Sequence, residues 1–467
     1  MPLRCYRAPC ESLVMRSGLR AADARGVLMR CLPLIAAVAG SSAVVWAQTH
    51  LSRGLPATET GVTIRVVPSM KIVCAKPTET SCVAAEPDKA MLLADIVRAA
   101  DNGRLTVATM HVDDPGAHAA LCAAAQHGAQ LSLLLDRNLF AKEHLRWLAS
   151  CAGPLGRFEA RYFGDIETSG RKTTWRLQHA KFLLAEPPAG PARIGISTGN
   201  LSEGAMTDNV ELWLDIGAPR TSSFYRTHIC MAEAFHAAAP AHPLPGADAP
   251  ASDDPKAFAQ HLSSCMHQRG ETPSWDAWHV EALLAREGIA TLPGPLPDAP
   301  LAKVLLDHTA RLGRNGAVDV VMPAFTSQYF LGALRDAAAR GIPVRILLDA
   351  RILRASGGLV HAWTFYRDYI RNAGLEVRFI VMDGDALMHH KAALFRNVDS
   401  GAHRAVVGSG RATTAALRDN YENDYVISDR ASVGSLLRSF DAMWAQGMPE
   451  GAAADQVRGR AQGVEIP

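Results

Sequence analysis

Strong charge of one sign is missing from this chain of 467 residues, in which 48 lysines and arginines stand against 46 aspartates and glutamates. The balance gives no support to a strongly basic nucleic-acid binder, although it leaves room for a local basic groove. With 48% hydrophobic and 20% charged residues, the composition also excludes a disordered chain and a collagen-like one. At about 150 residues per domain, the length predicts two or three domains.

Signals for a metal are also missing. No C-x-x-C pair occurs, which leaves little support for a zinc or redox motif, and no cluster of carboxylates suggests a metal site. We therefore expect neither a metal nor another cofactor. Beyond the first 49 residues, no stretch of the sequence is long and apolar enough to span a bilayer.

The N-terminus has the pattern of a secretory signal. Up to Ala47 the chain carries six arginines and two acidic residues, and the stretch from Cys31 to Thr49 is uncharged. Val45 and Ala47 occupy the −3 and −1 places of a plausible cleavage site. We expect 1–47 to be a signal peptide and the mature protein to be periplasmic or extracellular. The alternative is an uncleaved segment that anchors the protein in a membrane.

Cysteine usage agrees with export. Six of the nine cysteines follow the leader, and an even number in an exported chain indicates disulfides. The sequence leaves the connectivity open, and we favour the sequential pairs 74–82, 122–151 and 230–265 because they close short loops. The alternative is a set of buried free thiols.

The body of the chain is predicted to contain two lobes with a connection between them. Residues 240–300 hold ten of the 27 prolines, which is typical of a connecting segment. We expect an N-terminal lobe over 60–239, a C-terminal lobe over 301–446 and a tail over 447–467.

The two lobes repeat one pattern of strands and helices. In the first lobe, strand candidates that end at His111 and Asp136 flank a helical pattern, and the second lobe repeats this with strands that end at Met322 and Asp349. Strands that alternate with helices predict an α/β fold with parallel-rich mixed sheets. Two such halves predict similar α/β/α lobes about a pseudo-twofold axis.

Each half also contains a histidine and a lysine two residues apart in an apolar context. The pairs are His179 with Lys181 and His389 with Lys391, and equivalent residues are 210 apart. On a strand, residues two apart point to the same face, so each pair is predicted to project together. His390 is predicted to point to the opposite face.

The repeat continues downstream of these pairs. In the first half a Ser-Thr-Gly-Asn run ends at Asn200 and an Asn-x-Glu motif ends at Glu211. The second half has Gly-Ser-Gly-Arg, with Ser409 and Arg411, and then an Asn-x-Glu motif that ends at Glu422. Landmarks that recur at the same spacing indicate a duplicated unit rather than chance.

These residue types suit a reaction at a phosphodiester. One histidine can attack phosphorus and form a phosphohistidine, and the other can protonate the leaving oxygen and then activate water or an alcohol. The two lysines and neighbouring donors can hold the phosphate oxygens as charge develops. Glu211 and Glu422 can each bind the far nitrogen of a histidine and fix its tautomer. The alternative for the two glutamates is a solvated position at a sheet edge.

With these motifs the sequence resembles the phospholipase D superfamily, which carries two H-x-K-x4-D motifs, one in each half, with downstream G-S/G-N and N-x-E elements. The resemblance covers roughly residues 61–445 and is most specific in the duplicated H-x-K. It implies a two-lobed α/β/α fold with the active site between the lobes. It also implies a ping-pong mechanism through a phosphohistidine.

The chain departs from the family pattern at three positions. Glu186 and Arg396 stand where the family has aspartate, and Arg411 stands where the second half has asparagine. In lacking the motif aspartate, the chain resembles the tyrosyl-DNA phosphodiesterases. Arg411 can still hold a phosphate oxygen bidentately. Because the first half keeps the pattern better, we expect His179 to be the nucleophile and His389 the general acid.

The sequence therefore predicts an exported phosphodiesterase of the phospholipase D type that hydrolyses or transfers a phosphatidyl group. A phospholipid substrate is favoured over a polyanion because the mature chain is faintly acidic. One alternative is an exported nuclease or another nucleic-acid phosphodiesterase. The other is a degenerate, non-catalytic binding protein of the same fold. We expect a monomer whose lobes form an internal pair, with contact to a membrane surface.

Overall fold

The computed structural model describes residues 61–68, 89–137, 157–169, 172–241, 253–354, 359–398 and 401–461. These residues belong to one compact unit that runs from Glu59 to Pro467. The expected signal peptide, 1–47, lies outside the described residues. Among the helices of the described ranges, none combines the length and the apolar character needed to cross a bilayer.

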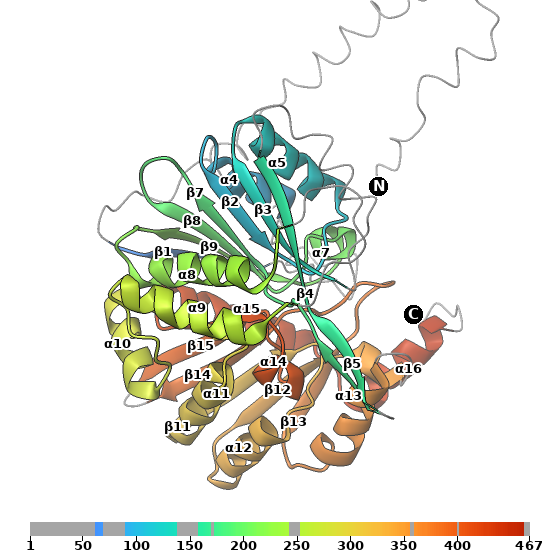
Figure 1. Cartoon of the computed structure of the whole chain (residues 1–467). Coiled ribbons are helices and arrows are strands. Elements are labelled where there is room, and N and C mark those ends of the chain that lie inside the picture. The colour runs from blue at the N-terminus through green and yellow to red at the C-terminus, as the bar shows by residue number, and fades with distance from the viewer. Residues whose placement is uncertain are drawn as a thin grey trace, which may run out of the picture. The chain divides into compact units, whose positions relative to one another are not determined.

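The N-terminal lobe is built on a seven-stranded mixed sheet with helices packed against it (Figure 1). In chain order the sheet contains β1 Thr63–Pro68, β2 Arg104–Ala108, β3 Gln130–Asp136, β4 Arg157–Phe163, β7 Phe182–Glu186, β8 Ala192–Ser197 and β9 Leu212–Ala218. In space the order is β1-β9-β8-β7-β2-β3-β4. Its helices are α4 Lys89–Arg98, α5 Pro115–Gln126, α7 Glu203–Thr207 and α8 Ser223–Ala238, and a separate hairpin joins β5 Asp165–Ser169 to β6 Lys172–Arg176.

The C-terminal lobe repeats this sheet. Its strands are β10 Ile289–Gly294, β11 Leu312–Met322, β12 Val344–Asp349, β13 Glu376–Ile380, β14 Ala392–Val398, β15 Ala402–Gly408 and β16 Glu422–Ile427. Their spatial order is β10-β16-β15-β14-β11-β12-β13, so β14 holds the central place that β7 holds in the first sheet. The helices here and before this lobe are α9 Pro255–Gln268, α10 Ala277–Glu287, α11 Pro300–Ala310, α12 Gln328–Ala339, η1 Ala350–Arg354, α13 Val360–Phe365, η3 Tyr366–Ile370, α14 Thr414–Arg418, α15 Arg430–Gln446 and α16 Glu450–Ala461.

The repeated strand–helix–strand unit forms for local reasons that the sequence shows. β3 is a buried apolar run that pairs in parallel with β2, and α5 crosses over between them. α5 begins after Asp114, whose Oδ1 accepts the amide of Ala117 at 2.7 Å, with a proline in its first turn. In the second lobe α12 connects β11 to β12 in the same way, after the N-cap Ser327.

The mixed character of both sheets agrees with the prediction. Parallel pairing is confined to β2, β3 and β4 in one sheet and to β11, β12 and β13 in the other. The remaining neighbours pair antiparallel, so antiparallel pairs are the more numerous and the prediction of parallel-rich sheets is wrong. The reason is that short connections join β7 to β8 and β14 to β15, and such connections favour antiparallel pairing.

The predicted boundary of the second lobe needs correction. Within the expected connection, 240–300, the structure has α9, α10 and the strand β10. β10 pairs antiparallel with β16, so the second sheet takes its edge strand from before residue 301. The expected tail contains α16, which packs Ala453 and Val457 into the core.

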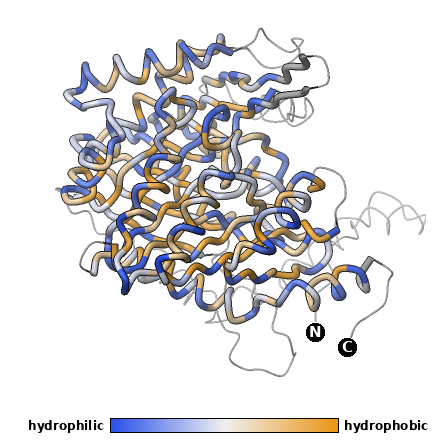
Figure 2. Tube along the Cα trace, turned by 90° about the horizontal axis from the view of Figure 1, so that it is seen from below, coloured by the Kyte–Doolittle hydropathy of each residue, from blue (hydrophilic) through white to orange (hydrophobic). Residues whose placement is uncertain are grey.

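One hydrophobic core runs through both lobes. Tyr421, immediately before β16, packs its ring against Phe163, Phe235 and Phe258. Helix α8 contacts β10 of the other sheet, and α15 contacts β1. Figure 2 shows hydrophobic residues gathered in the interior of the trace and hydrophilic ones spread over its outer parts. The lobes therefore share buried apolar surface, which fixes one lobe against the other.

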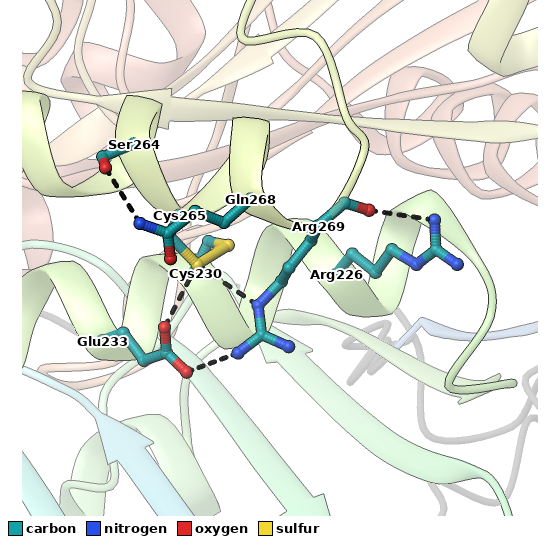
Figure 3. The surroundings of a disulfide bond; sticks show 7 residues. All are labelled: Arg226, Cys230, Glu233, Ser264, Cys265, Gln268 and Arg269. Atoms are coloured by element: carbon teal, nitrogen blue, oxygen red, sulfur yellow. Dashed lines mark hydrogen bonds and ion pairs between the residues drawn. A yellow bond between two sulfur atoms is a disulfide. The ribbon is translucent and has the colours of Figure 1, made fainter.

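A disulfide joins α8 to α9 at the lobe boundary (Figure 3). Cys230 and Cys265 form this bond, which confirms the predicted pair 230–265. Cys122 is disulfide-bonded as well, but Cys74, Cys82 and Cys151 lie outside the described residues, so the pairs 74–82 and 122–151 stay predictions. Within the described ranges, the group of residues near enough to hold a metal is Cys230, Glu233 and Cys265. Its two sulfurs are bonded to each other, which leaves no thiolate for a metal.

Candidate active site

The two histidine–lysine pairs lie immediately before the central strands of the two sheets. His179 and Lys181 precede β7, which begins at Phe182, and His389 and Lys391 precede β14. They were predicted within the strands, and this placement needs correction. Each segment leaves the ladder of its own sheet and instead pairs with the other lobe, which is why the strand begins only after the lysine.

This pairing is reciprocal between the lobes. The amide of His179 donates to the carbonyl of Tyr421, and the amide of Tyr421 donates to the carbonyl of Leu177, both at 2.9 Å. The amide of His389 likewise donates to the carbonyl of Val210 at 2.9 Å, and the amide of Val210 returns a bond to residue 387 at 2.8 Å. Tyr421 and Val210 are the middle residues of the two Asn-x-Glu motifs. The motifs thus bring the two histidine segments together at the boundary of the lobes.

Each histidine is bound by the glutamate of the other lobe. Nδ1 of His179 lies 2.8 Å from Oε2 of Glu422, and Nδ1 of His389 lies 3.0 Å from both carboxylate oxygens of Glu211. The four side chains are buried. A carboxylate accepts only, so each Nδ1 carries the hydrogen and each Nε2 keeps a lone pair. The predicted role of both glutamates as histidine partners is consistent with this geometry.

A side-chain hydroxyl and the side-chain amide of an asparagine, Asn420 or Asn209, donate to each glutamate in turn. Ser409 Oγ donates to Oε2 of Glu422 at 2.5 Å, and Thr198 Oγ1 donates to Oε2 of Glu211 at 2.7 Å. A Cβ atom at Gly199 would lie 2.5 Å from the Glu211 carboxylate, so the close approach requires glycine there. The Gly/Ser element therefore supports the glutamate rather than standing apart from it.

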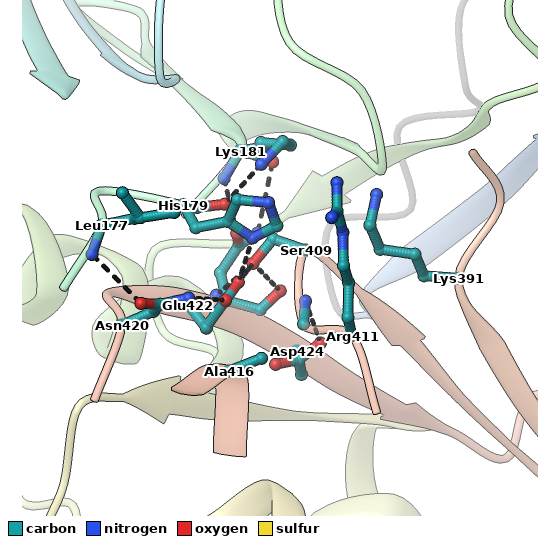
Figure 4. A network of polar contacts seen from close by, with 12 residues as sticks. Leu177, His179, Lys181, Lys391, Ser409, Arg411, Ala416, Asn420, Glu422 and Asp424 are labelled. Atoms are coloured by element: carbon teal, nitrogen blue, oxygen red, sulfur yellow. Dashed lines mark hydrogen bonds and ion pairs between the residues drawn. The ribbon is translucent and has the colours of Figure 1, made fainter. Parts of the chain in front are cut away.

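Lys181, Lys391 and Arg411 lie beside His179 in the polar network of the site (Figure 4). Lys181 Nζ donates to the carbonyl of His179 at 2.7 Å, and Lys391 Nζ donates to the carbonyl of Thr198 at 2.6 Å. Nη2 of Arg411 lies 3.1 Å from Nε2 of His389. A guanidinium has donors only, so Nε2 of His389 accepts in this arrangement. Within the described residues, no hydrogen bond is formed by Nε2 of His179.

Burial and the nearby cations keep both histidines neutral. Burial, with Lys181 and Arg411 beside it, lowers the pKa of His179 well below 6.5. Burial lowers the pKa of His389 to about 3, and Lys391 and Arg411 act in the same direction. Burial also lowers the pKa of Lys181 to about 7. Such perturbed groups, packed together, are typical of catalytic sites.

The remaining predicted residues fall in two places. Oδ1 of Asn200 lies 3.4 Å from the amide of Met110, and among the described residues no hydrogen bond joins Asn200 to either histidine. Glu186 ends β7, where it accepts hydrogen bonds from Tyr225 and Arg104, and Arg396 binds Asp319 at 2.6 Å on β14. The two positions of the motif aspartate are thus occupied by structural contacts on the strands, outside the histidine cluster.

Sequence reasoning missed several residues of the site. Thr198 repeats Ser409 at a spacing of 211, and Asn209 repeats Asn420 at the same spacing, so the repeat itself could have identified them. Asn423 has no such signal, because the first lobe has Leu212 in its place. Its Oδ1 accepts the amide of Lys181 at 2.6 Å, which holds the first segment from across the lobe boundary.

Comparison with known proteins agrees with this architecture. Residues 312–444 match the family model described as "Cardiolipin synthase, PLD-like domain". The chain is 29% identical over 178 residues to human mitochondrial cardiolipin hydrolase, across 36% of this chain and 64% of the relative. The mouse protein of the same name is 28% identical over 169 residues, across 35% of this chain and 70% of the relative. The match therefore spans less than two thirds of the human protein.

A solved structure with a similar fold is the phosphatidylserine synthase of Haemophilus influenzae Rd KW20. The TM-score is 0.50 with 12% sequence identity, and the alignment covers 80% of this chain and 91% of the synthase. The likeness between this chain and the synthase is one of fold.

Proposed function

We propose that the chain is a phosphodiesterase of the phospholipase D superfamily that cleaves or transfers a phosphatidyl group through a phosphohistidine, and support comes from its similarity to the cardiolipin synthase-like family model and to the cardiolipin hydrolases. The observation that carries the proposal is the pair of buried histidines, each bound at Nδ1 by a glutamate of the other lobe. That arrangement supplies two imidazoles whose Nε2 atoms serve one reacting group. Such a site needs both halves of the chain, which argues for a functional second half.

The nucleophile in this proposal is His179. Its imidazole is neutral, because burial lowers its pKa well below 6.5, and a neutral ring keeps a lone pair at Nε2. Glu422 holds the hydrogen at Nδ1 and aims that lone pair away from itself. Nε2 attacks phosphorus, a P–N bond forms, and the P–O bond to the leaving alcohol breaks.

His389 then serves as the general acid and base. In the free protein its Nε2 accepts from Arg411, so it must take up a proton when the substrate binds. The negative charge of a phosphodiester favours this uptake, and it also draws the Arg411 guanidinium toward the phosphate oxygens. His389 donates the proton to the leaving oxygen. It later accepts one from water or an alcohol, which attacks phosphorus and releases His179.

The cations of the site stabilise the transition state. Lys181, Lys391 and Arg411 place donors where the non-bridging oxygens carry increasing negative charge. That negative charge favours the protonated form of both lysines, whose pKa values are lowered by burial in the free protein. In a buried site such donors act more strongly than they would in water. The two lysines do not need to reorganise, since hydrogen bonds to backbone carbonyls already hold them in place.

The proposed substrate is an anionic glycerophospholipid such as cardiolipin. Support comes from the relatives, which are named as cardiolipin hydrolases, and from the family model for cardiolipin synthase. The faintly acidic balance of the mature chain also disfavours a long polyanion as the main ligand. We further propose that the protein acts outside the cytoplasm after removal of 1–47, for which the support is the leader pattern of the sequence.

The test is turnover on vesicles of cardiolipin, phosphatidylglycerol or phosphatidylcholine, with single-stranded DNA as a fourth substrate. We expect release of the alcohol from the anionic lipids and acid-labile phosphate on His179 after rapid quenching. Release of nucleotides alone would move the protein to the nucleic-acid class. Equal turnover by the wild type and His179→Ala on every substrate would overturn a catalytic role. His390→Ala is the matched control, because it changes the neighbouring buried histidine.

A further inference from the structure

Three consecutive backbone N–H groups are held at each histidine, each by a different part of the molecule. In the first lobe, the amide of Leu177 donates to Oδ1 of Asn420 at 3.0 Å and that of Gln178 donates to Oδ2 of Asp136 at 2.9 Å. The third amide, that of His179, donates to a carbonyl of the other lobe at 2.9 Å.

The second lobe repeats the arrangement bond for bond. The amide of Leu387 donates to Oδ1 of Asn209 at 2.8 Å, and that of Met388 donates to Oδ2 of Asp349 at 2.8 Å. The amide of His389 again donates to a carbonyl of the other lobe at 2.9 Å. The first and third bonds thus come from the other lobe, whereas the middle bond comes from an aspartate of the same lobe.

We propose that Asp136 and Asp349 are positioning residues that fix the two catalytic histidines against the sheets of their own lobes. Both aspartates end the strand that lies second from the histidine's own strand, so each carboxylate reaches the segment that crosses the end of the sheet. The inference rests on the proposed function only in that it takes His179 and His389 as the reacting groups.

The need for these aspartates follows from the way the segments lie. Residues 178 and 388 have left the ladders of their own sheets, so their amides have no strand partner in the sheet. A buried N–H without an acceptor is costly, and a carboxylate is a strong acceptor. Asp136 is 0% exposed and Asp349 is 2% exposed, so water cannot take their place. Without the bond, the segment would relax and the imidazole would move with it.

Asp349 also ties its segment to a neighbouring loop, and the two histidine segments differ in the side chain of the residue that the aspartate holds. Oδ1 of Asp349 accepts the amide of Arg351 at 2.7 Å, which fixes the start of η1 together with the histidine segment. In the first lobe, the side chain of Gln178 adds a second attachment, because its Nε2 donates to the carbonyl of Leu134 at 2.7 Å. Met388 has no side-chain donor. The histidine of the second lobe therefore depends more on its aspartate than that of the first.

The test compares Asp136→Ala, Asp349→Ala and the corresponding Asn variants, with Asp319→Asn as the matched control. Asp319 is equally buried but binds Arg345 and Arg396 on the strands, away from the histidines. We expect each alanine variant to lose about 10–100-fold in kcat with little change in KM, as for a misplaced catalytic group. The loss should be larger for Asp349→Ala. Asparagine keeps one acceptor oxygen and should restore part of kcat.

A second readout does not depend on turnover. In ¹⁵N NMR spectra of the free protein, Asp349→Ala should shift the imidazole resonances of His389 and leave those of His179 in place, and Asp136→Ala should do the reverse. Folded alanine variants with wild-type kcat and unchanged imidazole resonances would overturn the proposal, as would an equal loss in Asp319→Asn. If the wild type turns over no phosphodiester, the proposed function fails, whereas the NMR shifts still decide whether the aspartates position the histidines.

Discussion

Nδ1 of His179 lies 2.8 Å from Oε2 of Glu422, although 243 residues separate them in the chain. The reciprocal bond joins His389 to Glu211 across 178 residues. Each lobe therefore contributes a reacting group and the carboxylate that orients the reacting group of the other. Neither lobe alone contains a complete histidine–glutamate pair, which gives a physical reason for the duplication.

The first prediction concerns this crossed pairing. Glu422→Gln should lower kcat by about 10²–10⁴-fold, because the amide no longer fixes the hydrogen of His179 at Nδ1. The measurement is single-turnover formation of the phosphoenzyme, which should slow in Glu422→Gln. In Glu211→Gln the breakdown of the phosphoenzyme should slow, because Glu211 holds the histidine that activates water.

Glu376→Gln serves as the control for both variants, since this glutamate is exposed on β13. It should retain wild-type rates of both steps. Slower formation in Glu211→Gln, with normal formation in Glu422→Gln, would contradict the assignment and exchange the roles of the two histidines.

A second prediction concerns Arg411, which stands where the first lobe has Asn200. Burial lowers the pKa of His389 to about 3, with Lys391 and Arg411 contributing. Arg411→Asn removes one positive charge and should raise that pKa. The protonated form of His389 then persists to higher pH, so the basic limb of the kcat/KM profile should move upward.

Titration of the His389 imidazole by NMR gives the same quantity directly. Arg335→Asn, an exposed arginine on α12, is the control and should leave both the titration and the profile unchanged. A basic limb that moves to lower pH in Arg411→Asn would contradict the proposed acid.

The third prediction separates the motif-aspartate positions from catalysis. Arg396 on β14 binds Asp319 of β11 at 2.6 Å and Asp441 of helix α15 at 2.8 Å. Arg396→Ala should lower the free energy of unfolding by about 1–3 kcal/mol, as expected for lost charge-assisted hydrogen bonds. Denaturant unfolding measures this, and kcat of the folded variant should stay within about twofold of wild type. A large loss of kcat at unchanged stability would place residue 396 in the site after all.

The fourth prediction concerns the bond between α8 and α9. The disulfide Cys230–Cys265 closes a loop of 35 residues, so Cys230→Ser with Cys265→Ser should cost about 2–4 kcal/mol of unfolding free energy. Thermal unfolding with and without a reductant provides the measurement. The wild type in reductant should approach the double variant, and the double variant itself should not respond. Equal stability of all four samples would show that the bond contributes nothing.

The sequence determined which residues form the site better than it determined how they are arranged. The duplicated histidine, lysine and glutamate were visible because the repeat places them 210 or 211 residues apart. The alternation of apolar strands and helices likewise predicted the two α/β lobes, since that periodicity is local. The strand β10 was missed within a proline-rich stretch, because its place in the second sheet depends on pairing with β16, more than a hundred residues later.

Only the tertiary structure decided which groups meet. The sequence could not show that each glutamate binds the histidine of the opposite lobe, because pairing within one lobe satisfies the same motifs. It also could not show that the histidine segments leave their sheets, since an apolar H-x-K run predicts a strand. Local chemistry fixes which side chains can react, whereas contacts between residues far apart in sequence fix where their atoms point.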